Sequence, residues 1–207
     1  LNFSEEQLKH VTKEDALKHP SCVMGEKITI DSASMMNKGF EVIEAKWLFD
    51  LKPEQIKVLV HPQSIVHSMV EFQDGSIKAQ LGRSDMKLPI RYAFSFPDRW
   101  TSTDERLSFD EILKLEFGQP DVKKFPCLTL AYEALKKGGN LPCILNAANE
   151  VAVAAFLNHR LHFTRLPKVL LATMEKHDFI ANPTLEDYLN TDKEARRIAT
   201  EVIAALS

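Results

Sequence analysis

The hydrophobic and polar positions follow two different patterns along the chain. From about residue 27 to residue 83, apolar residues recur at short intervals and many are β-branched, which favours strands. From about residue 125 onwards, apolar residues recur every three or four positions and Ala and Leu are frequent, which predicts amphipathic helices. The polar segment 98–122 between these regions predicts a connector with one short helix at residues 109–115.

The first half is predicted to combine strands with two helices. The predicted strands are residues 27–31, 56–61, 65–72 and 76–81, and the predicted helices are residues 35–49 and 85–96. Ser32 and Ser34 stand just before the first helix and suit its N-cap, because their hydroxyls accept hydrogen bonds from free backbone N–H groups. Asp74 and Gly75 predict a hairpin turn, because Gly adopts a positive φ without steric strain. The short connections make the sheet mainly antiparallel.

The second half is predicted to be a small helical bundle. Its helices are expected to start at Pro126, at about residue 146, at about residue 166 and at Thr191. Each of them carries an apolar stripe that has to be buried against a neighbouring helix. We therefore predict an α+β fold, with a mainly antiparallel sheet and its helices in residues 1–97, the connector in 98–122, and a helical bundle in 123–207.

Polar residues near the predicted helix starts are interpreted as caps. Thr191 and Glu194 have the spacing of a capping box, in which each side chain bonds the other residue's backbone N–H. Asn146, Asn149 and Glu150 resemble a polar site, but an N-cap followed by a first-turn acid is the simpler interpretation, and we prefer it.

Composition and charge narrow the class of protein. The chain has 207 residues, of which 44% are hydrophobic and 27% charged, as in ordinary globular domains. Its seven glycines form neither a G-x-G-x-x-G nor a G-x-x-x-x-G-K pattern, which excludes a complete phosphate-binding loop of either type. A net charge of −3 argues against nucleic acid as a partner. Three widely spaced cysteines favour a reducing compartment. No apolar run is long enough to cross a membrane, and a first residue other than Met leads us to expect a fragment.

The most informative segment for chemistry is residues 28–41. Asn37 and Glu41 are four positions apart and Lys38 and Glu41 three apart, so one helix face can carry all three, with Ser32 in the turn before it. A hydroxyl, an amide and an ammonium suit a phosphate, and a carboxylate one turn further suits a hard cation. A capped helix with a surface ion pair is the alternative, and spacing alone favours it, because such pairs are common and weak.

Three histidines lie in segments that are predicted to be loops or strand ends. His19 stands between Pro and Gly residues in a loop, where it either binds a phosphate or shuttles a proton, or is simply solvated. Cys22 is three residues away, but a Cys-His nucleophile pair normally comes from separate elements. His61 and His67 are interpreted as structural residues, because an extended chain between them would hold them too far apart to share a metal.

Three long segments, DSASMMNKGFEVIEAKWLF, HPQSIVHSMVEFQDGSIKAQLGRSDMKLPI and LNAANEVAVAAFL, resemble the 1-deoxy-D-xylulose 5-phosphate reductoisomerase family. The resemblance runs from about residue 8 to residue 207. It implies that residues 1–97 are the C-terminal part of an α/β catalytic domain. It also implies NADPH-dependent conversion of 1-deoxy-D-xylulose 5-phosphate to 2-C-methyl-D-erythritol 4-phosphate, with Mg²⁺ or Mn²⁺, by a homodimer in a bacterial cytoplasm or a plastid-type organelle.

The resemblance also implies roles for individual residues. Ser32, Asn37 and Lys38 would hold the phosphate and a hydroxyl of the substrate, and Glu41 would bind both substrate and metal. Lys38 and Glu41 would therefore be the catalytic pair. His19 would contact the substrate from a mobile lid, and Gly25 would border the nicotinamide.

Two features depart from the family. The glycine-rich NADPH-binding domain, and the Asp and Glu that complete the metal site in the family, are not in this sequence, so we predict that the chain by itself is inactive. The alternative function is a fragment that keeps sugar-phosphate binding and dimerisation only. The second departure is Cys22, which stands where the family usually has an aromatic residue over the substrate.

Overall fold

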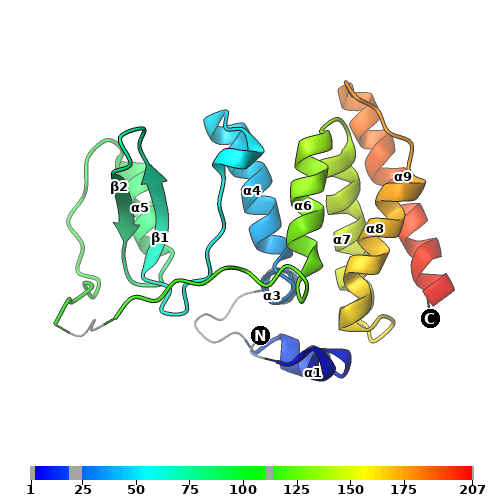
Figure 1. The fold of residues 1–207 in the computed structure, drawn as a ribbon, viewed down its shortest axis with the longest axis horizontal. Coiled ribbons are helices and arrows are strands. Elements are labelled where there is room, and N and C mark those ends of the chain that lie inside the picture. The colour runs from blue at the N-terminus through cyan, green and yellow to red at the C-terminus, as the bar shows by residue number, and fades with distance from the viewer. Residues whose placement is uncertain (1–2, 19–24, 111–113, 207) are drawn as a thin grey trace. The chain divides into compact units, whose positions relative to one another are not determined.

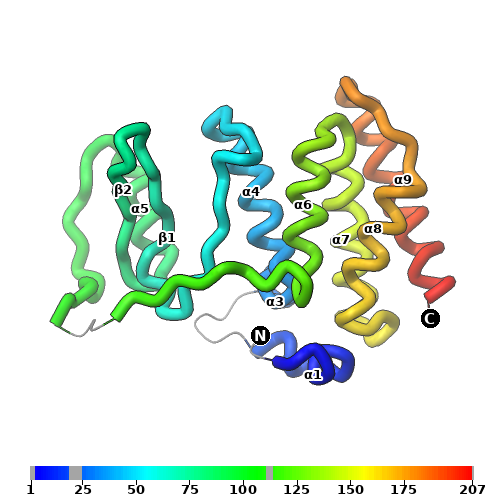
Figure 2. The backbone as a smooth tube through the Cα atoms, in the orientation of Figure 1, coloured from blue at the N-terminus to red at the C-terminus, as the bar shows by residue number. Residues whose placement is uncertain are grey.

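The computed structural model describes residues 3–18, 25–110 and 114–206 (Figures 1 and 2). These residues form two compact units. The larger unit comprises Leu1–Val58 and Asp121–Ser207, and the smaller unit comprises Leu59–Pro120. By packing, the first 58 residues therefore belong with the C-terminal helices. The predicted division into a catalytic domain, a connector and a helical domain stays a prediction.

The described part of the larger unit is helical. Its elements are α1 (Glu5–Lys9), α2 (Lys13–Ala16), α3 (Glu26–Ala33), α4 (Met36–Phe49), a 3₁₀ turn η1 (Pro53–Gln55), α6 (Pro126–Lys137), α7 (Leu141–Leu157), a second 3₁₀ turn η2 (Phe163–Arg165), α8 (Leu166–Lys176) and α9 (Leu185–Leu206). Helix α7 packs against α3, α6, α8 and α9, and Figure 1 shows α4, α6 and α7 following one another side by side. Ile144, Leu145 and Ala148 of α7 are fully buried, so α7 is the centre of the core.

Small residues let α4 and α6 approach closely. A Cβ built on Gly39 of α4 would lie only 2.6 Å from the Cβ of Ala131 on α6. Next to this contact, Val42 of α4 is buried with Leu128 and Leu135 of α6. The apolar side of α4 is thereby fixed against α6, and its other side is left for polar residues.

The smaller unit contains a hairpin and one helix. Strand β1 (Val66–Glu71) pairs antiparallel with β2 (Ile77–Leu81), and helix α5 (Lys87–Ser95) follows. Gly75 has φ +81° in the connecting turn, where the backbone N–H of Ser76 donates to Asp74 Oδ1 at 2.9 Å. The predicted antiparallel hairpin is confirmed, and together with the helices it makes the chain α+β.

Two predicted strands are wrong. Residues 27–31 belong to helix α3, because Thr29, Ile30 and Asp31 are buried against the rest of the larger unit and burial outweighs the strand preference of β-branched residues. Segment 56–61 contributes a single bridge, between Val60 and Gly118. The short helix expected at 109–115 is not seen in its described residues, and residues 111–113 lie outside them.

Two predicted helix starts are also wrong. Helix α7 begins at Leu141, so Asn146, Asn149 and Glu150 lie inside it and cap nothing. Helix α9 begins at Leu185, where Thr184 and Asp187 bond each other's backbone N–H groups at 2.8 and 3.2 Å. Thr191 is instead a buried residue inside α9. The predictions of α4, α5, α6 and α8 are confirmed.

Candidate functional site

Helix α4 brings together three of the residues singled out from the sequence. The Asn37 side chain donates from Nδ2 to Glu41 Oε1 at 2.7 Å, and the Lys38 ammonium forms an ion pair with the other carboxylate oxygen, Oε2. The side chains of Lys38 and Glu41 are each 44% exposed. The shared face that spacing predicted is confirmed, and it is open to a ligand.

The packing of α4 explains why this face is presented to solvent. Met36, Gly39 and Val42 are buried and recur every three residues, so they lie on the side that meets the core. Met35, just before the helix, has φ +63° and turns the chain from α3 into α4. The polar residues at the intervening positions are therefore left at the opposite side.

Ser32 does not lie in a turn before α4. It is in the last turn of α3, and its hydroxyl donates to the carbonyl of Ile28 at 2.8 Å. The N-cap position of α4 is Met35, which gives no side-chain cap, although Ser34 Oγ accepts from the N–H of Met36 at 3.4 Å. The predicted strand, turn and capped helix are thus replaced by two consecutive helices, with Ser32 half-buried on the first.

Gly25 stands immediately before α3. Its carbonyl accepts from the backbone N–H and from the hydroxyl of Thr29, at 3.1 and 2.9 Å, and a Cβ built on it would meet nothing within 4 Å. Within the described residues, the structure records no hydrogen bond from Gly25 or Ser32 to the side chains of Asn37, Lys38 or Glu41. His19 and Cys22 lie outside the described residues.

A buried polar cluster that the sequence interpretation missed anchors α3. Asp31 is 2% exposed, and its carboxylate accepts from Asn149 Nδ2 of α7 at 2.8 Å and pairs with Lys27 Nζ at 2.8 Å. Burial, together with the negative charge of Asp31, raises the pKa of the Cys127 thiol to about 12. The signal in the sequence was Asn149 itself, an amide within a largely apolar helix.

The other polar residues of α7 also have structural roles. Glu150 accepts from Asn146 Nδ2 at 3.4 Å and pairs with Arg196 of α9 at 2.6 Å.

In the smaller unit, His61 Nδ1 lies 2.7 Å from the carbonyl of Glu116, and His67 Nε2 lies 3.2 Å from that of Ser64. The hydrogen bonds expected of both histidines are present, and their interpretation as structural residues stays a prediction.

The donor set for a metal is incomplete in the described residues. No group of three His, Cys, Asp or Glu side chains there is close enough together to hold an ion. The Glu41 carboxylate and the neighbouring Asn37 amide do offer the oxygen ligands that Mg²⁺ prefers. These two residue types fit an oxygen-coordinated divalent cation, but they are too few to hold one without further ligands. The described residues also include no helix with the length and apolarity to span a bilayer.

Two family models match the chain. The DXP reductoisomerase C-terminal domain matches residues 81–198, and the 1-deoxy-D-xylulose 5-phosphate reductoisomerase C-terminal domain matches residues 1–49. The chain belongs to the 1-deoxy-D-xylulose 5-phosphate reductoisomerase family. The resemblance seen in the sequence is thereby confirmed.

Curated relatives of the reductoisomerase family match nearly all of this chain. The chain is 63% identical over 198 residues to the enzyme of Bacteroides thetaiotaomicron, which covers 96% of the chain and 51% of the relative. It is 53% identical to the enzyme of Chlorobium phaeobacteroides, covering 98% of the chain and 53% of the relative. The chain thus spans about half the length of the curated relatives it matches.

Solved structures of reductoisomerases share the fold. A complex of DOX-P reductoisomerase with NADPH, fosmidomycin and magnesium has a TM-score of 0.92 at 44% identity, over 100% of this chain and 53% of that one. The Zymomonas mobilis enzyme in complex with NADPH has a TM-score of 0.90 at 44% identity, over 98% of this chain and 52% of that one.

Proposed function

We propose that the protein carrying this chain isomerises and reduces 1-deoxy-D-xylulose 5-phosphate to 2-C-methyl-D-erythritol 4-phosphate, with NADPH and a divalent cation, Mg²⁺ or Mn²⁺, in non-mevalonate isoprenoid synthesis. The single observation that carries the proposal is the half-exposed face of α4. There an amide and an ammonium converge on one carboxylate, in a chain of the reductoisomerase family.

Lys38 and Asn37 are the proposed partners of the substrate phosphate. An ammonium and an amide N–H both donate hydrogen bonds to phosphate oxygens. The hydroxyl of Ser32 is a third proposed donor. Because the phosphate is remote from the reacting carbons, its binding energy orients them without itself taking part in the reaction. His19 and Gly25 keep their proposed places beside the substrate and the nicotinamide.

Glu41 is the proposed metal ligand of this chain and also contacts the substrate. When bound, a divalent cation polarises the substrate carbonyl and stabilises the negative charge that develops on its oxygen. One carboxylate does not make a tight divalent site. We propose that the remaining ligands, and the NADPH-binding domain, come from the half of the family's length that this chain does not span.

Two consequences follow for the chain taken alone. We propose that it transfers no hydride, and that it keeps affinity for the sugar phosphate through Lys38 and Asn37. This is the alternative function, that of a binding and dimerisation fragment.

The smaller unit supports a homodimer, because its hairpin leaves Met69, Val70 and Ile77 exposed. The bacterial origin of the named relatives favours the cytoplasm over a plastid-type organelle.

The test replaces Glu41 in the protein that carries this chain and follows NADPH absorbance during turnover. We expect Glu41→Gln to raise the Mg²⁺ concentration needed for half-maximal rate by at least about tenfold, the scale on which loss of a metal contact acts. Glu44→Gln is the matched control, because Glu44 is an exposed acid on the same helix. An unchanged Mg²⁺ response in Glu41→Gln would remove Glu41 from the metal site.

A second arm tests the phosphate role of Lys38. Lys38→Gln removes one charged hydrogen bond, worth about 1.5–3 kcal/mol, so KM for the sugar phosphate should rise by about ten- to a hundredfold. Lys136→Gln, an exposed lysine of α6, is the control for loss of one positive charge. Equal KM values for the two variants would contradict the phosphate role. The 207-residue chain alone should oxidise no NADPH, and activity from it would contradict the proposed division of the site.

A further inference from the structure

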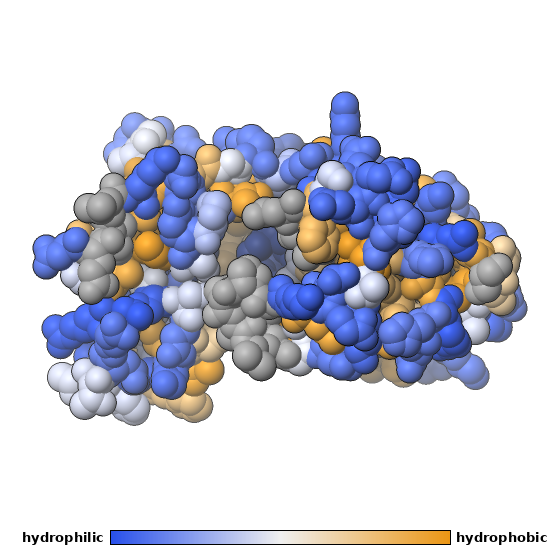
Figure 3. Space-filling model, turned by 90° about the horizontal axis from the view of Figure 1, so that it is seen from below, coloured by the Kyte–Doolittle hydropathy of each residue, from blue (hydrophilic) through white to orange (hydrophobic). Residues whose placement is uncertain are grey.

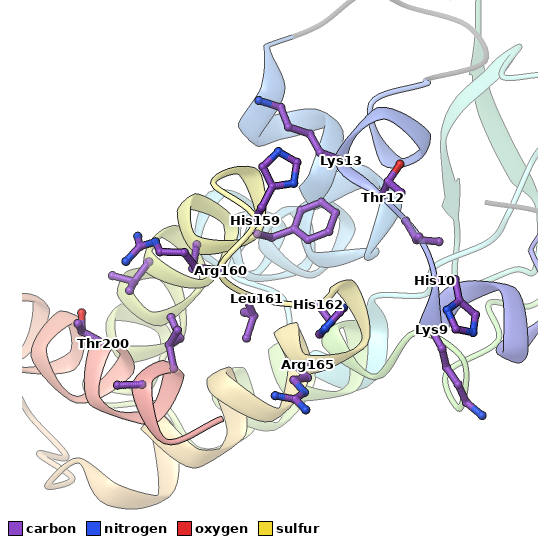
Figure 4. A pocket seen from close by; sticks show the side chains of 16 residues that line it. Lys9, His10, Thr12, Lys13, His159, Arg160, Leu161, His162, Arg165 and Thr200 are labelled. Carbon is purple, nitrogen blue, oxygen red and sulfur yellow. The ribbon is translucent and has the colours of Figure 1, made fainter. Parts of the chain in front are cut away.

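A cavity lies in the larger unit, and none of the described residues of the proposed active site lines it. Its volume is about 1060 Å³. Its walls come from three segments: the stretch from the end of α1 into α2, the end of α7 with the loop that follows it, and the last turns of α9 (Figure 4). Neither Asn37, Lys38 nor Glu41 is among the lining residues. The cavity is therefore distinct from the face of α4 described above.

The charged side chains that line the cavity are all basic among the described residues. Four of the lining residues are Lys or Arg and three are His, and no Asp or Glu lines it in the part of the chain that is described: Lys9, Lys13, Arg160, Arg165, His10, His159 and His162. For a chain with more acidic than basic residues, this is a marked local excess of positive charge. A cavity lined in this way attracts anions.

Two of these cations are not neutralised by any residue that the structure describes. Lys9 pairs with Glu6 at 2.6 Å and Lys13 with Glu26 at 3.0 Å, so their charges are already balanced. The guanidinium groups of Arg160 and Arg165 have no ion pair or hydrogen bond to the described residues. Arg165 is also half-buried. Each guanidinium therefore keeps its donors available for a carboxylate, sulfonate or phosphate.

The floor of the cavity is apolar. Val11, Ala155, Phe156 and Leu161 line it and are at most 8% exposed. In the space-filling view, hydrophilic side chains border apolar ones on this side of the larger unit (Figure 3). An inorganic anion would use only the charged rim, and a neutral apolar molecule only the floor. A ligand with both parts would use the whole cavity.

We propose that this cavity binds a small organic anion with an apolar body, such as an aryl or acyl phosphate, sulfonate or carboxylate. The apolar body lies on the floor formed by Phe156 and Leu161, and the anionic group lies at the rim with Arg165, while Arg160 adds positive charge at another part of the rim (Figure 4). The positive rim and the absence of carboxylates among the described lining residues select the charge of the ligand. The buried apolar floor selects its body.

The probe is 1-naphthyl phosphate, titrated calorimetrically into the protein that carries this chain. We expect it to bind at least about tenfold more tightly than inorganic phosphate or 1-naphthol, because it alone uses both rim and floor. Arg165→Gln should weaken binding about tenfold, the loss of one charge-assisted hydrogen bond, and Arg160→Gln should weaken it less. Both side chains are at the surface or half-buried, so the variants should fold, which circular dichroism checks.

Two control variants distinguish binding in this cavity from binding elsewhere on the protein. Lys136→Gln removes an exposed charge on α6 that does not line the cavity, and it should leave the affinity unchanged. Lys38→Gln should also leave the affinity unchanged, because Lys38 does not line the cavity. A loss of affinity in this variant would mean that the probe's phosphate is held at the proposed substrate site. Inorganic phosphate binding as tightly as the probe would overturn the proposal. So would unchanged affinity in both arginine variants, or a loss in Lys38→Gln alone.

Discussion

Replacing Gly39 by alanine tests whether close packing of α4 on α6 positions the candidate site. The new Cβ would lie 2.6 Å from the Cβ of Ala131 and 3.5 Å from the sulfur of Met36. The sulfur can move by rotation of a flexible side chain. The two Cβ atoms are fixed to their backbones, so the first contact is relieved only if the helices move apart.

The size of the effect is the difference between two opposing contributions. Overpacking of this kind costs about 1–3 kcal/mol of unfolding free energy. Alanine is favoured over glycine inside a helix by about 1 kcal/mol, which offsets part of the loss. We therefore expect Gly39→Ala to lower the unfolding free energy by about 1 kcal/mol and by no more than about 2. The same movement displaces Asn37, Lys38 and Glu41 together, so kcat/KM should fall as well.

The decisive measurement is a double-mutant cycle in urea. Ala131→Gly removes the atom that clashes, and alone it should cost about 1 kcal/mol through helix propensity. In the double variant the clash is absent, so it should be more stable than the sum of the single effects by about 1 kcal/mol or more. Gly118→Ala is the control, because a Cβ there would meet nothing within 4 Å. Additive effects of the two substitutions would refute the packing argument.

Two further substitution and labelling experiments address the buried cluster. Asn149→Ala takes one donor from the buried Asp31 carboxylate, and we expect a loss of about 1.5–3 kcal/mol in urea unfolding; Asn190→Ala, at an exposed position of α9, should change little. A loss no larger than the control's would show that the bond does not anchor α3. Because burial raises the pKa of Cys127 to about 12, its thiol should resist iodoacetamide in the folded protein and react once urea unfolds it. Peptide mass spectrometry that finds Cys127 labelled as fast as the half-buried Cys143 in the folded protein would contradict this.

Elements whose signals are local could be predicted from the sequence. Helix α6 begins at a proline and ends at two glycines, and both signals act within a few residues of the boundary. The hairpin between β1 and β2 was predicted from Asp74 and Gly75 because a tight turn needs a positive φ at that point. No distant contact is required to interpret either signal.

Elements decided by distant packing could not be predicted in this way. Segment 27–31 has a strand-like sequence, yet it is helical because Ile30 is buried in the core and Asp31 bonds a residue 118 positions later. Thr191 has the spacing of a cap, yet it is buried and accepts from Asn140 Nδ2 at 3.1 Å. In both cases the competing interaction comes from another helix, and the local pattern carries no trace of it.

The same distinction separates the two candidate sites. Asn37, Lys38 and Glu41 meet because three- and four-residue spacings lie on one face of any α-helix, so their convergence was predictable. The prediction that Ser32 lies in a turn was wrong because it depended on a predicted strand before it, and that segment is helical. The basic cavity was not predicted at all, since its walls come from segments about 150 residues apart.

The state of Glu41 in this structure bears on how such a site is kept ready. Its carboxylate is shared between the Asn37 amide and the Lys38 ammonium, so the charges of Lys38 and Glu41 balance each other within α4. The pair is nearly half exposed, and ion pairs of this kind stabilise a protein by only about 0–1 kcal/mol. A ligand that separates the pair therefore forfeits little stability, and in its absence the two charges of the pair balance each other. A cation bound at Glu41 would take over the neutralising role that Lys38 has now, and a phosphate bound at Lys38 would take over that of Glu41. Binding of one ligand would therefore favour binding of the other.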